Sequence, residues 1–117
     1  MGFLTTHVLD TAHGCPAAGM TVVLYRLEAD SATREIKRIE TNQDGRADGP
    51  ILPESGFAPG TYRLDFHVGD YYRRKKEPLP EPAFLDVVPV LFGMAEDSHY
   101  HVPLLVSPYG YSTYRGS

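Results

Sequence analysis

Apolar and polar residues alternate without interruption between Thr61 and Val68. A period of two places successive side chains on opposite faces of a β-strand, so this segment is predicted to be a strand with one buried face. The apolar residues of that face are Tyr62, Leu64, Phe66 and Val68. The opposite face carries Arg63, Asp65 and His67. A strand of this kind needs neighbouring strands and a second layer to cover its apolar side.

Several other short segments are predicted to be strands, and turn signals separate them. These segments are 3–10, 20–27, 34–41, 86–92, 100–106 and 109–115, and the Asp44-Gly45 turn predicts that a further strand begins at Arg46. The stretch 77–82 contains three prolines, which remove ladder donors, so it cannot be a central strand. A short helix is expected after it. About eight strands and at most one short helix predict an all-β fold, a sandwich or a barrel.

The length of 117 residues and the 42% of hydrophobic residues are typical of one domain with a real core, so residues 1–117 are predicted to form a single domain. The net charge of −4 argues against nucleic acid as a partner, because phosphates require a basic face. The run Arg73-Arg74-Lys75-Lys76 is the exception. It is interpreted as a solvated strand end or loop, with an anionic ligand or partner as the alternative.

Cys15 is the only cysteine, so no intramolecular disulfide is possible, which favours a reducing compartment. It lies in a turn without an activating pattern and is expected to be an ordinary thiol. No segment approaches the ~20 apolar residues of a membrane span. No signal peptide is visible either, so we expect a cytoplasmic protein without a membrane partner.

Two histidines, His99 and His101, share one face of the predicted strand 100–106, opposite its apolar face. Solvated surface histidines are the plain interpretation, and an acid–base pair or a metal pair are the alternatives. His7 likewise faces away from an apolar layer. No recognised zinc spacing accompanies these residues, so we expect no metal and no other cofactor. Arg46 beside them would bind a planar ligand or stabilise an oxyanion.

The C-terminal segment is unusually rich in tyrosine, with Tyr109, Tyr111 and Tyr114 within its last nine residues. Chain ends are ordinarily frayed and polar. Three large aromatic side chains are costly to leave in water, so this segment is predicted to pack against this subunit or another one.

Three motifs resemble those of the 5-hydroxyisourate hydrolases, the transthyretin-related enzyme family. They are Thr6-His7-Val8-Leu9-Asp10, Asn42-Gln43-Asp44-Gly45-Arg46, and the ending from His99-Tyr100-His101-Val102-Pro103-Leu104-Leu105 to Ser107-Pro108-Tyr109-Gly110-Tyr111-Ser112-Thr113-Tyr114-Arg115-Gly116-Ser117. The resemblance covers essentially the whole chain and departs mainly within 80–97. Transthyretin, a hormone carrier, shares the fold but lacks the histidines and the Tyr-Arg-Gly-Ser ending.

This resemblance implies a transthyretin-like two-sheet β-sandwich that assembles as a homotetramer, a dimer of dimers with active sites in a channel. It implies hydrolysis of 5-hydroxyisourate, a small purine-derived substrate, to 2-oxo-4-hydroxy-4-carboxy-5-ureidoimidazoline. The implied catalytic residues are His7, Arg46, His101 and Ser117, with His7, Arg46 and Tyr114 binding substrate. His99 keeps the plain interpretation. The alternative functions are a small-ligand binding module without catalysis and, more weakly, a zinc-dependent hydrolase.

Overall fold

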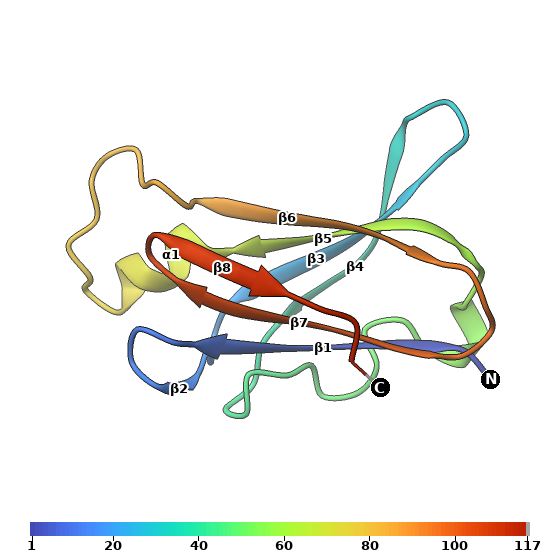
Figure 1. Ribbon diagram of the computed structural model, residues 1–117, viewed down its shortest axis with the longest axis horizontal. Coiled ribbons are helices and arrows are strands. Elements are labelled where there is room, and N and C mark those ends of the chain that lie inside the picture. The colour runs from blue at the N-terminus through green and yellow to red at the C-terminus, as the bar shows by residue number, and fades with distance from the viewer. Residues whose placement is uncertain (117) are drawn as a thin grey trace.

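The computed structural model describes residues 1–116, and these form eight strands, one α-helix and one 3-10 helix (Figure 1). The strands are β1 (Phe3–Asp10), β2 (Cys15–Pro16), β3 (Thr21–Leu27), β4 (Thr33–Glu40), β5 (Gly60–His67), β6 (Val87–Met94), β7 (His99–Ser107) and β8 (Gly110–Thr113). The 3-10 helix η1 (Glu54–Gly56) and the helix α1 (Val68–Arg74) complete the list. The predicted all-β class, with two sheets and one short helix, is confirmed.

The strands form two four-stranded sheets, ordered β2-β1-β7-β8 and β4-β3-β5-β6. In the first sheet β1 and β7 run parallel, and the register pairs Phe3 with His99, Thr5 with His101 and His7 with Pro103. The other strand pairs in both sheets are antiparallel. The β1–β7 ladder therefore brings residues 3–10 and 99–106 side by side.

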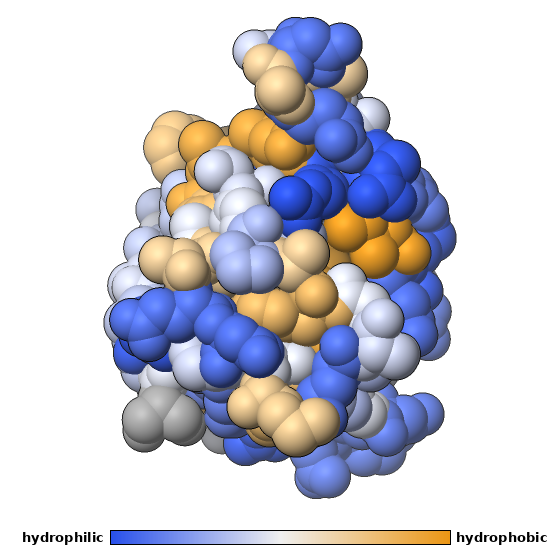
Figure 2. All heavy atoms as spheres, turned by 90° about the vertical axis from the view of Figure 1, so that its right-hand side faces the viewer, coloured by the Kyte–Doolittle hydropathy of each residue, from blue (hydrophilic) through white to orange (hydrophobic). Residues whose placement is uncertain are grey.

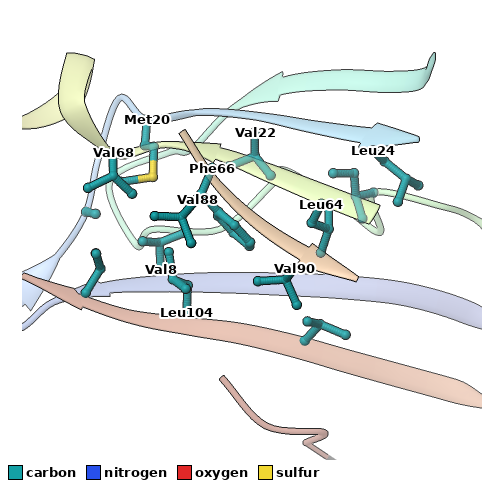
Figure 3. Packing of buried hydrophobic residues seen from close by; sticks show 14 of the residues in the cluster. Val8, Met20, Val22, Leu24, Leu64, Phe66, Val68, Val88, Val90 and Leu104 are labelled. Carbon is teal, nitrogen blue, oxygen red and sulfur yellow. The ribbon is translucent and has the colours of Figure 1, made fainter. Parts of the chain in front are cut away.

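The two sheets enclose one hydrophobic core (Figure 3). Val8 and Leu104 point from the first sheet toward Phe66 and Val88 of the second, and all four side chains are buried. Tyr62, Leu64 and Phe66 are buried as the alternation in β5 predicted. Burying a side chain of this size stabilises the fold by about 1.5–3 kcal/mol. Since the core-facing residues of β1 and β7 are fixed in this way, their alternate residues must lie on the outer face of the first sheet.

Helix α1 lies directly after β5, and the predicted helix after the proline-rich stretch is wrong. Val68, Tyr71 and Tyr72 have the spacing i, i+3 and i+4, which forms one apolar face of a helix, and all three are buried. Val68 was predicted as the end of the preceding strand, but it is the first residue of this helix. The basic run 73–76 was predicted to be a strand end or a loop, but its first two residues, Arg73 and Arg74, are the last residues of the helix.

Helix α1 is anchored to the end of β1 through Asp10, which is fully buried. The hydroxyls of Tyr71 and Tyr72 each donate to its carboxylate at 2.8 Å. His13 Nδ1 lies 2.7 Å from the same carboxylate, and His13 Nε2 lies 2.8 Å from Glu77. Burial opposes the charge on Asp10, but the hydrogen bonds from His13 and the two tyrosines outweigh it and lower the Asp10 pKa. This network ties the β1–β2 turn, the helix and the following loop together.

The segment after β4 forms a turn, as predicted, but Arg46 does not begin a strand. Gly45 adopts φ +74°, a left-handed conformation that suits glycine, and its carbonyl accepts from the Val8 amide at 2.8 Å. Isolated bridges then join Arg46 to His7 and Leu52 to Leu4. The segment from Arg46 to Leu52 therefore runs beside β1 as a loop, because isolated bridges and not a continuous ladder join it to the strand.

The surface at the end that carries the N-terminus and the β3–β4 hairpin has separate apolar patches among hydrophilic side chains (Figure 2). Within residues 1–116 there is no helix that is both long and apolar enough to cross a membrane.

The last strand ends at Thr113, two residues earlier than predicted. Tyr109, Tyr111 and Tyr114 remain exposed in the single chain, so their predicted packing against another subunit stays a prediction.

Candidate active site

His7 and Arg46 face one another at the border between β1 and the loop after β4. They are partners in an isolated antiparallel bridge, and partners of this kind project their side chains to the same face. His7 alternates with the buried Thr6 and Val8, so this face is the outer face of the first sheet. Arg46 is exposed and forms no ion pair with any residue in 1–116. Its guanidinium is therefore free to bind an anionic or carbonyl oxygen.

His101 lies on the same outer face, on the neighbouring strand β7. Its cross-strand partner is Thr5, two residues before His7, so the two imidazoles are diagonal neighbours on this face. The ring is half-buried, and its Nδ1 lies 2.8 Å from the hydroxyl oxygen of Thr5. The register of the sheet therefore gathers His7, Arg46 and His101 from three separate segments onto one face.

His99 is not the solvated histidine of the plain interpretation. Its ring stacks on Phe3 with a centroid distance of 4.2 Å and an interplanar angle of 7°. Its Nε2 lies 2.8 Å from the same Thr5 hydroxyl that contacts His101. Alternation within the sequence placed both histidines on one face but gave no sign of Thr5, because the pairing of β1 with β7 is not readable from spacing.

The C-terminal segment bends back across β7 after β8 (Figure 1). The Gly116 amide donates to the His101 carbonyl at 2.7 Å, which makes a second isolated bridge at the site. Arg115 stacks over the Tyr100 ring at 4.0 Å and donates to the His99 carbonyl. The segment is thus held on the edge of β7 next to the histidines. Ser117, the remaining predicted catalytic residue, lies outside the described residues.

Tyr114 does not join the histidine face within the single chain. It lines an apolar pocket of about 220 Å³ together with Tyr100, Val102 and Phe92, which lie on the core side of β7 and on β6. The pocket offers tyrosine hydroxyls and Arg115 but no histidine and no carboxylate. The chemistry-bearing side chains are on the open outer face, and we place the candidate site there.

The electrostatics of the site favour neutral imidazoles. Burial and then the positive charge of Arg46 lower the pKa of His7, while hydrogen bonding to the Asp44 backbone offsets part of the shift. Burial, Arg46 and the two other histidines lower the pKa of His101. Two neutral imidazoles beside a permanent cation can accept a proton while the cation stabilises negative charge. No cluster of three or more metal-ligating side chains is formed by residues 1–116.

The two sheets and their parallel β1–β7 ladder define a transthyretin-like β-sandwich. Residues 4–116 match the model of the HIUase/Transthyretin family. The chain is 63% identical to 5-hydroxyisourate hydrolase 2 of Rhizobium meliloti (strain 1021), over 99% of this chain and 97% of the relative. The chain belongs to the HIUase/Transthyretin family.

Two solved structures extend this comparison. (S)-allantoin synthase superposes with a TM-score of 0.92 and 45% identity over 99% of this chain, which spans only 44% of that chain. Sea bream transthyretin in complex with thyroxine superposes with a TM-score of 0.86 and 26% identity, over 97% of this chain and 93% of the other. The fold is thus shared by enzymes and by a thyroxine-binding protein. The fold alone therefore does not decide between these functions, and the side chains of the site must be compared.

Proposed function

We propose that the protein hydrolyses 5-hydroxyisourate to 2-oxo-4-hydroxy-4-carboxy-5-ureidoimidazoline. The observation that carries this proposal is the convergence of His7, Arg46 and His101 on one sheet face with both imidazole pKa values lowered. The name of the Rhizobium meliloti relative supports the same substrate and makes catalysis the favoured function over simple ligand binding.

The reaction needs a base, an oxyanion site and a proton for the departing nitrogen. A neutral histidine, His7 or His101, takes a proton from water as the water oxygen attacks the ring carbonyl. Arg46 stabilises the resulting oxyanion, as expected for a guanidinium that forms no ion pair within residues 1–116. The carbon–nitrogen bond then breaks, the carbonyl carbon becomes a carboxylic acid, and the ring nitrogen takes up the proton that the histidine base removed from water, directly or through the second histidine. The proposed mechanism uses no cofactor, because a histidine activates the attacking water.

In this proposal a second subunit closes the open face that carries the site. His7, Arg46 and His101 lie on an open face, where a substrate remains in contact with bulk water. Hydrolysis is faster where the polar groups act in an enclosed site of lower dielectric constant. We propose that the face is closed by another copy in a homotetramer, with Tyr114 and Ser117 completing the substrate pocket. The exposed tyrosines of the C-terminal segment support such an interface.

The domain and compartment remain the expectations derived from the sequence. One core shared by both sheets supports a single domain over residues 1–117. The half-exposed free thiol of Cys15 is compatible with a reducing cytoplasm.

The proposal is tested by mixing purified protein with freshly generated 5-hydroxyisourate and following ultraviolet absorbance. We expect the wild-type protein to accelerate the decay over the protein-free rate. The variant His67→Asn is a matched control, since His67 lies on β5 in the other sheet. Decay at the protein-free rate with wild type would exclude catalysis and favour a ligand-binding protein. Activity that survives exhaustive chelation would exclude the zinc-dependent alternative.

A further inference from the structure

The hydroxyl of Thr5 bridges two histidines of the site. Its Oγ1 lies 2.8 Å from His101 Nδ1 and 2.8 Å from His99 Nε2. A threonine hydroxyl carries one hydrogen and two lone pairs, so it donates to at most one of the two rings. The protonation of the two imidazoles is therefore coupled through a single hydrogen atom.

The orientation of the His101 ring leaves one nitrogen for the reaction. The ring atoms that flank its attachment point are both engaged, because Nδ1 contacts Thr5 and Cδ2 lies against the backbone of Gly116. The opposite edge of the ring carries Nε2, the second nitrogen. A histidine that takes a proton from water at Nε2 must hold its own proton at Nδ1.

We infer that Thr5 and His99 are positioning residues that hold His101 as the Nδ1–H tautomer, with the lone pair of Nε2 facing the substrate. In this arrangement His101 Nδ1–H donates to Thr5, and the Thr5 hydroxyl donates to His99 Nε2. His101 Nδ1, Thr5 Oγ1 and His99 Nε2 then each have a hydrogen-bond partner. This inference rests on the proposed function, and it assigns His101 as the base that the mechanism requires.

The position of His99 suits the end of such a chain. Its stack on Phe3 fixes the plane of the ring, so that Nε2 points along β1 to Thr5. Hydrogen bonds in series polarise one another, so proton uptake at His101 strengthens both bonds. Supporting partners orient metal-binding histidines in the same way, and the loss of such a partner costs about 10–100-fold in metal affinity or activity.

Thr5→Val tests the inference, because valine keeps the shape of threonine and removes the hydroxyl. We expect kcat to fall about 10–100-fold with KM changed little, since the base is mispositioned rather than the substrate. Thr5→Ser is expected to restore most of kcat. Thr61→Val makes the same exchange at an exposed position of β5 and is expected to match wild type. A Thr5→Val enzyme within twofold of the wild-type kcat would overturn the inference.

Nitrogen-15 NMR of the five histidines gives a readout that is independent of activity. We expect His101 of the wild-type protein to be protonated at Nδ1, and Thr5→Val to shift it toward the Nε2–H form. His99→Phe keeps the stack on Phe3 but removes the acceptor, and the same loss of tautomer preference is expected. An Nε2–H tautomer in the wild-type protein would overturn the inference. An inactive wild type with the Nδ1–H tautomer would overturn the proposed function alone.

Discussion

The backbone of Gly116 packs directly against the imidazole of His101. A β-carbon at position 116 would lie 2.6 Å from Cδ2 of the ring, closer than real contacts allow, and 3.2 Å from its Cγ. The Gly116 amide also donates to the His101 carbonyl, so the backbone cannot retreat without losing this bond. The C-terminal segment therefore fixes the position of a predicted catalytic side chain, and glycine is required for the approach.

Gly116→Ala should impair catalysis without unfolding the protein. The added methyl group must displace either the His101 ring or the C-terminal segment, and a displacement of about 1 Å near the reacting groups can cost on the order of 100-fold in rate. Hydrolysis rates and thermal unfolding of the variant check this expectation. Gly49→Ala is the matched control, because a β-carbon there meets open space. Equal activity of the two variants would contradict the role of the packing.

The rate of hydrolysis should depend on pH through His7 and His101. Both pKa values lie below the ordinary 6.5, so both rings are neutral at pH 7 and above. We expect a constant kcat/KM at neutral and alkaline pH, with a fall below pH 6.5 as protonation removes the base. Rate measurements from pH 5 to pH 9 test this, with near-ultraviolet circular dichroism to confirm that the fold persists. A half-maximal rate above pH 6.5 would contradict the lowered pKa values.

Asp10→Asn should destabilise the fold while leaving the outer face of β1 in place. The change removes the charge that accepts from His13, Tyr71 and Tyr72 in a fully buried position. Hydrogen bonds to charged groups contribute about 1.5–3 kcal/mol each, and some are retained by the amide, so we expect a loss of about 2–4 kcal/mol. Urea unfolding measures this loss. Asp97→Asn, at an exposed position, should change stability by less than about 0.5 kcal/mol.

The Asp10 network also predicts how stability depends on pH. The pKa of Asp10 is lowered by its hydrogen bonds, so the stability that it contributes is present above its ordinary pKa of 3.8. That contribution is lost as the pH falls through the lowered value.

His13 contributes to stability in the opposite sense, because Asp10 and Glu77 raise its pKa. Its contribution is present below pH 6.5 and is lost as the pH rises through the raised value. Urea unfolding of wild type and His13→Gln across pH 5–9 should show converging stabilities at high pH, and a constant difference would contradict the account.

The strands were predictable because alternation is a local signal. The alternation of buried and half-buried residues in β5 follows from a period of two, and β4 was predicted as a strand over 34–41. Helix α1 was misplaced because Val68 continues the alternation of β5 while also starting the spacing of Tyr71 and Tyr72. A short segment that satisfies both periods is decided by tertiary packing, here by the hydrogen bonds of the tyrosines to Asp10.

The sequence predicted which residues form the site, but it predicted less of how their side chains are arranged in space. Parity placed His99 and His101 together and His7 away from an apolar layer, and the family resemblance gave catalytic roles to His7, Arg46 and His101. The parallel register that brings Thr5 between the two histidines depends on pairing across more than 90 residues, which no local pattern encodes. Arg46 was expected to begin a strand, but only one residue pair joins it to β1. Such long-range contacts follow from the closure of the whole sandwich.

The central claim is that Arg46 and His101 act together on one substrate, and a double-mutant cycle on kcat/KM tests it most directly. Each of Arg46→Ala and His101→Ala is expected to lower kcat/KM by about 100–1,000-fold. Because both groups serve the same transition state, the double variant should lose much less than the product of the two single losses. Single variants that hydrolyse 5-hydroxyisourate as fast as the wild type, or losses that multiply fully, would contradict the account.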